Sequence, residues 1–113
     1  MKIKNKTRNI MIAENCIVAD TFFSRLKGLL GKKSIDQDTA LLITPCNSIH
    51  MFFMKFPIDV LFIDKNDIIV HMVNNIKPWR TSKIVRHSEK VIELPAGSLL
   101  KNGTCVGDEL IFE

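Results

Sequence analysis

Tyrosine is absent from this sequence of 113 residues, tryptophan occurs once, and cysteine occurs only three times. Phenylalanine supplies seven aromatic side chains, so we expect a core packed around phenylalanine. Cys16, Cys46 and Cys105 are odd in number and widely separated, which favours reduced thiols over a disulfide framework. The compact ligand spacings typical of zinc sites are also missing, and we predict neither a metal nor a cofactor.

Long hydrophobic runs are missing too. No stretch approaches the roughly 20 apolar residues that a membrane helix requires, and the N-terminus lacks the apolar run of a signal peptide. The length fits one domain covering residues 1–113. These absences predict a single soluble domain in the cytoplasm, with no membrane partner.

The net charge of +4 is small, and its distribution bears on nucleic-acid binding. Lys2, Lys4, Lys6 and Arg8 recur at every second position, which places them on one face of an extended strand. We call these four residues the N-terminal comb. In the rest of the chain, 12 basic residues balance 12 acidic ones. Because lysines commonly protect edge strands from aggregation, we interpret the comb as a solvated edge and predict no nucleic-acid partner.

Most of the chain has the short apolar runs and frequent turn signals of a mainly β protein. We predict a small sandwich or barrel of short, mostly antiparallel strands. A hairpin is expected around residues 13–15, a further strand at 49–54, and a second hairpin around residues 65–67. One short helix is expected near residues 21–30, ended by Gly31, and a helical turn near 98–101.

Residues 46–64 combine reactive and apolar side chains more densely than the rest of the sequence. If residues 46–54 are extended, Cys46 and His50 share a face but lie about 13 Å apart, too far for a nucleophile–base pair unless the chain turns. A metal site at these residues lacks the usual spacings. A polar pocket in an apolar surround is the third alternative.

Two carboxylates support the pocket hypothesis, because each interrupts an apolar strand. Asp59 lies between Ile58 and Val60, and Glu93 lies between Ile92 and Leu94. Carboxylates in such surroundings usually have partners. For Asp59 we expect Arg80 first and Lys55 second. The predicted binding site therefore comprises His50, Lys55, Asp59, Arg80 and Glu93, with no catalytic residue and no metal ligand assigned.

Six ordered motifs resemble a known family: GLLG at 28–31, CNSIH at 46–50, FMKFPIDVLFID at 53–64, PWR at 78–80, ELPAG at 93–97 and GD at 107–108. Together they look like the domain of unknown function 192 family over residues 20–113. The resemblance implies a small β-rich domain and carries over no catalytic residue. It further implies an unidentified small-molecule or protein partner, with proteins of pilus or secretion systems among the candidates.

Three functions remain open from the sequence. The first is a non-catalytic accessory domain that binds a ligand or partner at the five-residue polar site. The second is a small hydrolase or transferase that uses His50 with Asp59 or Glu93, which needs a concave site and a nearby base. The third is an interaction domain that acts through an exposed strand.

Overall fold

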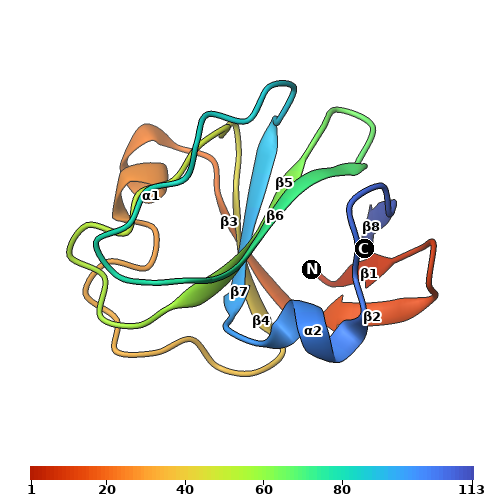
Figure 1. Ribbon diagram of the computed structural model, residues 1–113, viewed down its shortest axis with the longest axis horizontal. Coiled ribbons are helices and arrows are strands. Elements are labelled where there is room, and N and C mark those ends of the chain that lie inside the picture. The colour runs from red at the N-terminus through yellow and green to blue at the C-terminus, as the bar shows by residue number, and fades with distance from the viewer.

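The structure, a computed structural model, describes residues 1–113 apart from the side chain of Phe22. Eight strands form two sheets (Figure 1). The smaller sheet has the order β2 (Ile10–Ala13), β1 (Ile3–Asn5), β8 (Leu110–Phe112). The larger has the order β3 (Asn15–Ala19), β4 (Thr39–Ile43), β7 (Lys90–Pro95), β5 (Ile58–Ile63), β6 (Ile69–Ile76). All pairings are antiparallel except that of β3 with β4.

The five-stranded sheet is covered on both faces. The three-stranded sheet and α2 (Ser98–Asn102) lie on one side of it, and α1 (Phe22–Lys27) lies on the other, together with long loops (Figure 1). Each face has its own apolar cluster. Neighbouring residues of a central strand point to opposite faces, so such a strand contributes to both clusters. The predicted mainly β fold is confirmed as a sandwich, and the strands do not close into a barrel.

Aliphatic residues dominate the core, contrary to the expectation of a phenylalanine core. Phe62 is fully buried in the centre of β5, but Phe23 and Phe53 are 79% and 70% exposed. Most fully buried large side chains are isoleucine and leucine. The β-branched and leucine side chains of the central strands fill the space between the layers. Of the remaining phenylalanines, Phe23 on α1 and Phe53 in a loop are exposed, while Phe112 on β8 packs against the edge of the core.

The helix α1 begins as predicted and ends earlier. The Thr21 side chain accepts a hydrogen bond from the Ser24 amide while the Ser24 hydroxyl accepts one from the Thr21 amide, a capping box. The C-cap is Gly28, at φ 47°, rather than Gly31. The predicted helical turn near 98–101 is confirmed as α2. Neither helix of the described chain is long and apolar enough to cross a membrane.

Two predictions near the N-terminus are wrong. β2 and β3 do not form a hairpin, because β2 pairs with β1 and β3 pairs in parallel with β4. β1 is the central strand of its sheet, not an edge. The cations of the comb are used locally: Lys2 pairs with Glu14, Lys6 with Glu109, and Arg8 with Asp108. Strand partners are tertiary choices that periodicity does not encode.

The strand predicted at residues 49–54 is also wrong, since this segment belongs to an irregular loop. The loop is fixed by backbone hydrogen bonds to a second loop, residues 77–88. The Met51 amide donates to the Arg80 carbonyl at 2.7 Å, and the Trp79 amide donates to the Met51 carbonyl at 2.8 Å. Only one isolated bridge, between His50 and Thr81, resembles strand pairing. These bonds hold both loops on the α1 side of the large sheet.

Candidate functional site

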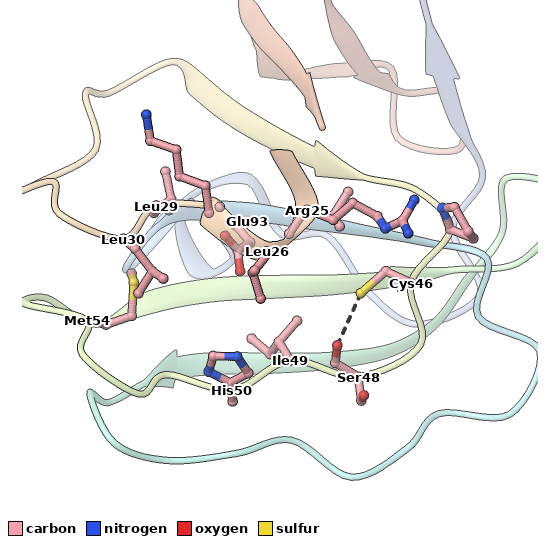
Figure 2. Close-up of a pocket in the computed structure, with 14 residues that line it drawn as sticks. Arg25, Leu26, Leu29, Leu30, Cys46, Ser48, Ile49, His50, Met54 and Glu93 are labelled. Atoms are coloured by element: carbon pink, nitrogen blue, oxygen red, sulfur yellow. Dashed lines mark hydrogen bonds between the residues drawn. The ribbon is translucent and has the colours of Figure 1, made fainter. Parts of the chain in front are cut away.

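A pocket of about 140 Å³ opens between α1 and the loop that follows β4 (Figure 2). We call it the Glu93 pocket. Its walls combine an apolar part with a few polar groups, as small-molecule sites usually do. The lining residues include Arg25, Leu26 and Leu29 from α1 and its C-terminal turn, Cys46, Ser48 and His50 from the loop, and Met54 and Glu93.

Strand alternation directs Glu93 into this pocket. On β7, Ile92 and Leu94 face the three-stranded sheet, so Glu93 faces the α1 side. β7 is a central strand, and Glu93 lies opposite Leu41 on β4 and Val60 on β5. The carboxyl group is therefore flanked by apolar side chains within the sheet. The pocket lies on this face of the sheet, and Glu93 is part of its lining.

Glu93 has an unusual electrostatic environment. The residue is 6% exposed, and burial raises the pKa of its carboxyl from 4.5 to about 7. Among the described side chains, none forms a hydrogen bond or an ion pair with this carboxyl. Every fully buried polar side-chain atom in the described part of the structure has a hydrogen-bond partner. Because the Glu93 carboxyl oxygens have none, they are not fully buried, and they face the open space of the pocket. A buried carboxyl that faces a pocket without a partner marks a functional-site candidate.

His50 and Cys46 come from the loop on the other side of this space. Figure 2 shows the His50 ring and the Glu93 carboxyl on opposite walls of the pocket. The Cys46 thiol donates a hydrogen bond to the Ser48 carbonyl at 3.1 Å, and burial raises the pKa of this thiol. A thiol with a raised pKa has little thiolate at neutral pH, which argues against a cysteine nucleophile.

The chemistry available in the Glu93 pocket is hydrogen bonding and proton exchange. A carboxyl with a pKa near neutrality can donate or accept a proton, and the half-buried Arg25 adds positive charge at the wall. Among the described residues, no group of three or more His, Cys, Asp or Glu side chains is arranged to hold a metal ion.

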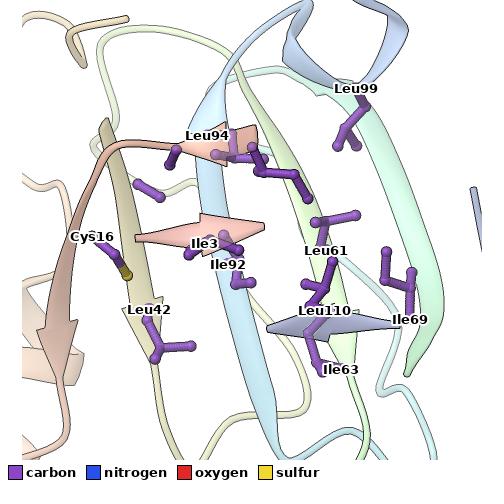
Figure 3. Packing of buried hydrophobic residues seen from close by; sticks show 13 residues of the cluster. Ile3, Cys16, Leu42, Leu61, Ile63, Ile69, Ile92, Leu94, Leu99 and Leu110 are labelled. Atoms are coloured by element: carbon purple, nitrogen blue, oxygen red, sulfur yellow. The ribbon is translucent and has the colours of Figure 1, made fainter. Parts of the chain in front are cut away.

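Asp59 lies on the other face of the sheet. It precedes Val60, the partner of Glu93, so the two carboxylates point to opposite sides. Asp59 accepts hydrogen bonds from the Asn75 amide at 2.8 Å and the Leu99 amide at 3.0 Å. The prediction of a basic partner is wrong, because backbone amides satisfy the carboxylate. Asp59 joins β6 and the first turn of α2 to β5, beside the core residues Leu61 and Leu99 shown in Figure 3.

Lys55 and Arg80 are exposed on the two loops and do not line the Glu93 pocket. Of the five predicted site residues, the pocket therefore unites His50 and Glu93. Arg25 and Met54 are lining residues that the sequence did not single out. Arg25 falls within the helix that the sequence predicted near residues 21–30. Its position beside Cys46 is a tertiary contact, because it depends on how α1 lies against the loop that follows β4.

An interaction domain that acts through an exposed strand, the third function considered from the sequence, would use β3. This strand is at the edge of the large sheet, and Ile17 and Val18 are 55% and 41% exposed. A groove of about 480 Å³ runs between β3 and the turn after α1. Addition of a partner strand at this edge stays a prediction.

A family model for DUF192, described as an uncharacterized ACR, matches residues 2–112. The chain belongs to the DUF192 family. A UPF0127 protein of Thermococcus sibiricus is 33% identical over 113 residues, covering 96% of this chain and 73% of that protein. A UPF0127 protein of Pyrococcus horikoshii is 35% identical over 100 residues, covering 84% of each. These archaeal relatives confirm the resemblance that the six motifs indicate.

Two crystal structures share the fold of this DUF192 chain. A protein of unknown function from Novosphingobium aromaticivorans superposes with a TM-score of 0.82 at 15% identity, covering 98% of this chain and 82% of its own. A candidate transcription regulator from Sinorhizobium meliloti gives a TM-score of 0.80 at 22% identity, covering 97% of this chain and 89% of its own. At these identities the likeness concerns the fold alone.

Proposed function

We propose that this DUF192 domain binds a small ligand in the Glu93 pocket and that an ammonium group of the ligand pairs with the Glu93 carboxylate. The observation that carries the proposal is the carboxyl itself, which is buried, faces the pocket and has no partner among the described side chains. An ionised carboxylate only accepts hydrogen bonds, so a donor with positive charge complements it best.

The size of the pocket limits the ligand. An engineered protein cavity of about 150 Å³ holds one benzene molecule, so a pocket of about 140 Å³ suits a ligand of roughly six to ten non-hydrogen atoms. The apolar wall residues Leu26, Leu29 and Met54 would contact a short carbon chain. Arg25 supplies a positive group that would attract a carboxylate at the other end of the same ligand.

Three probes of similar length test this proposal. Propylamine carries only the ammonium group, propionate only the carboxylate, and β-alanine both. In two-dimensional NMR titrations of the labelled protein, we expect β-alanine and propylamine to shift the amides of residues 25–30 and 46–50, and β-alanine to bind more tightly. Propionate alone should bind weakest, because Glu93 repels it when ionised.

Proton release gives a second readout. An ammonium group beside Glu93 lowers the pKa of the carboxyl, so binding at pH 7 should release protons and the binding enthalpy should depend on the ionisation enthalpy of the buffer. Glu93→Gln should weaken β-alanine binding at least tenfold, whereas the exposed control Glu89→Gln should not. Equal binding to wild type and Glu93→Gln would refute the proposal.

A further inference from the structure

Three exposed aromatic rings form a surface beside the mouth of the Glu93 pocket. Phe52, Phe53 and Trp79 are 42%, 70% and 59% exposed. The ring centroid of Trp79 lies 4.9 Å from that of Phe53 and 6.2 Å from that of Phe52, and Phe52 stacks on His50 at 5.1 Å. We call Phe52, Phe53 and Trp79 the aromatic ledge. Contiguous exposed apolar surface of this kind marks an interaction site.

The backbone holds these rings in place. Phe53 and Trp79 have φ angles of 63° and 70°, in the left-handed region that bulky side chains rarely adopt. The Trp79 amide donates to the Met51 carbonyl, which ties the two loops together at the ledge. Such strain persists only where the surrounding structure enforces it, and it concentrates at functional sites. The chain therefore maintains an unfavourable conformation that keeps the aromatic rings at the surface.

The same two loops carry the positive charge of the protein. Residues 45–57 and 77–88 contain five basic side chains and no acidic one: Lys55, Lys77, Arg80, Lys83 and Arg86. Of the 16 basic and 12 acidic residues in the chain, 11 basic and 12 acidic ones lie elsewhere. The two loops thus carry a charge of +5 and the rest of the chain carries −1, which together give the net charge of +4.

These five cations are available to a partner. Within the described structure none of them takes part in an ion pair, whereas three of the four cations of the N-terminal comb do. The expectation that nucleic acid does not bind attributed the excess positive charge to the N-terminal comb. In the structure three of the four comb cations pair with acidic side chains, while the unpaired cations of the two loops lie on the same segments as the exposed rings.

From this juxtaposition of exposed aromatic rings and unpaired cations, we propose that the aromatic ledge binds single-stranded nucleic acid. Each nucleotide offers a base that can stack on a ring and a phosphate that can pair with a cation, so this ligand uses both features. An acidic peptide would use only the cations. A duplex keeps the faces of its bases stacked inside the helix and would leave the rings uncovered.

Binding can be measured by fluorescence anisotropy with a labelled 12-mer of deoxythymidine. We expect a dissociation constant in the micromolar range at 50 mM NaCl, and a loss of affinity of at least tenfold at 200 mM NaCl as counterions compete. Trp79 is the single tryptophan of the chain, so quenching of its intrinsic fluorescence reports stacking directly. Absence of either binding or quenching at 50 mM NaCl would overturn the proposal.

Single substitutions distinguish the contribution of the aromatic rings to binding from that of the cations. Phe53→Ala should weaken binding by about five- to 100-fold without changing the salt dependence, because it removes stacking. Lys83→Gln should weaken binding and also reduce the slope of log affinity against log salt. The control Lys2→Gln, in the paired comb, should bind like wild type. Glu93→Gln should also bind normally, which distinguishes the ledge from the Glu93 pocket.

Competing ligands complete the test. A polyglutamate of matched charge and a duplex of the same length should bind at least tenfold more weakly than the single strand. Equal or tighter binding of either one would overturn the proposal and show that charge alone determines affinity. Tighter binding to vesicles containing phosphatidylserine would also overturn it and identify the ledge as a surface for anionic lipid.

Discussion

The pH dependence of unfolding should change when Glu93 is replaced by glutamine. Burial raises the pKa of this carboxyl from 4.5 to about 7 in the folded protein, whereas the unfolded chain exposes it to water. Between pH 4.5 and 7 the folded protein retains a proton that the unfolded chain has released. The contribution of Glu93 is therefore fully present below pH 4.5 and is lost as the pH rises through about 7.

The magnitude follows from the same two values. At about 1.36 kcal/mol per pH unit, the interval from 4.5 to about 7 corresponds to about 3 kcal/mol of unfolding free energy. Glutamine has nearly the shape of the protonated carboxyl and does not ionise. We therefore expect Glu93→Gln to be within about 1 kcal/mol of wild type at pH 4 and more stable than wild type by about 3 kcal/mol at pH 8.5.

Urea unfolding of both proteins from pH 4 to 8.5 measures this difference. Subtracting the two profiles cancels the titration of every other group. Glu89→Gln is the matched control, since Glu89 is exposed and lies just before the same strand, β7. Parallel profiles for wild type and Glu93→Gln, or a variant that is less stable at pH 8.5, would refute the reasoning, because they would mean that the ionised carboxylate has a favourable partner.

Three further substitutions test the structure around the site by urea unfolding. Asp59→Ala should cost about 2–4 kcal/mol, because it leaves the buried Leu99 amide and the partly buried Asn75 amide without an acceptor, and a cost below about 1 kcal/mol would contradict this assignment. Burial alone would raise the pKa of Asp108, but hydrogen bonds, with Arg8 foremost, outweigh it and lower the pKa. Arg8→Gln should therefore destabilise the protein at pH 7, with the difference shrinking as the pH falls through the lowered pKa of Asp108; a difference that grows as the pH falls would exclude this coupling. Thr21→Ala should cost about 1 kcal/mol through loss of the capping box, and no change would show that the helix does not need it.

Local signals in the sequence predicted the elements that depend on neighbouring residues. The turn expected around residues 65–67 joins β5 and β6, and the helical turn expected near residues 98–101 is α2. The start of α1 agrees with the helix expected near residues 21–30, and the structure assigns its N-cap to Thr21. Periodicity and capping are short-range properties, which is why the sequence alone reveals them.

The positions of the carboxylates required the tertiary structure. The sequence marked Asp59 and Glu93 as buried, and both are. Whether they share a site depends on the register of β5 against β7, which places Glu93 opposite Val60 and so turns Asp59 to the other face. A change of register by one residue would have united them, and nothing in either strand alone specifies that choice.

Charge and aromatic residues illustrate the same division. Composition established a net charge of +4 and few aromatic residues, and the spacing of Lys2, Lys4, Lys6 and Arg8 was visible in the sequence. Only the tertiary structure decided that most of these cations pair with acidic residues and that Phe52, Phe53 and Trp79 meet at the surface. Contacts between residues distant in the chain depend on how the loops and sheets pack, and local sequence patterns carry no record of that packing.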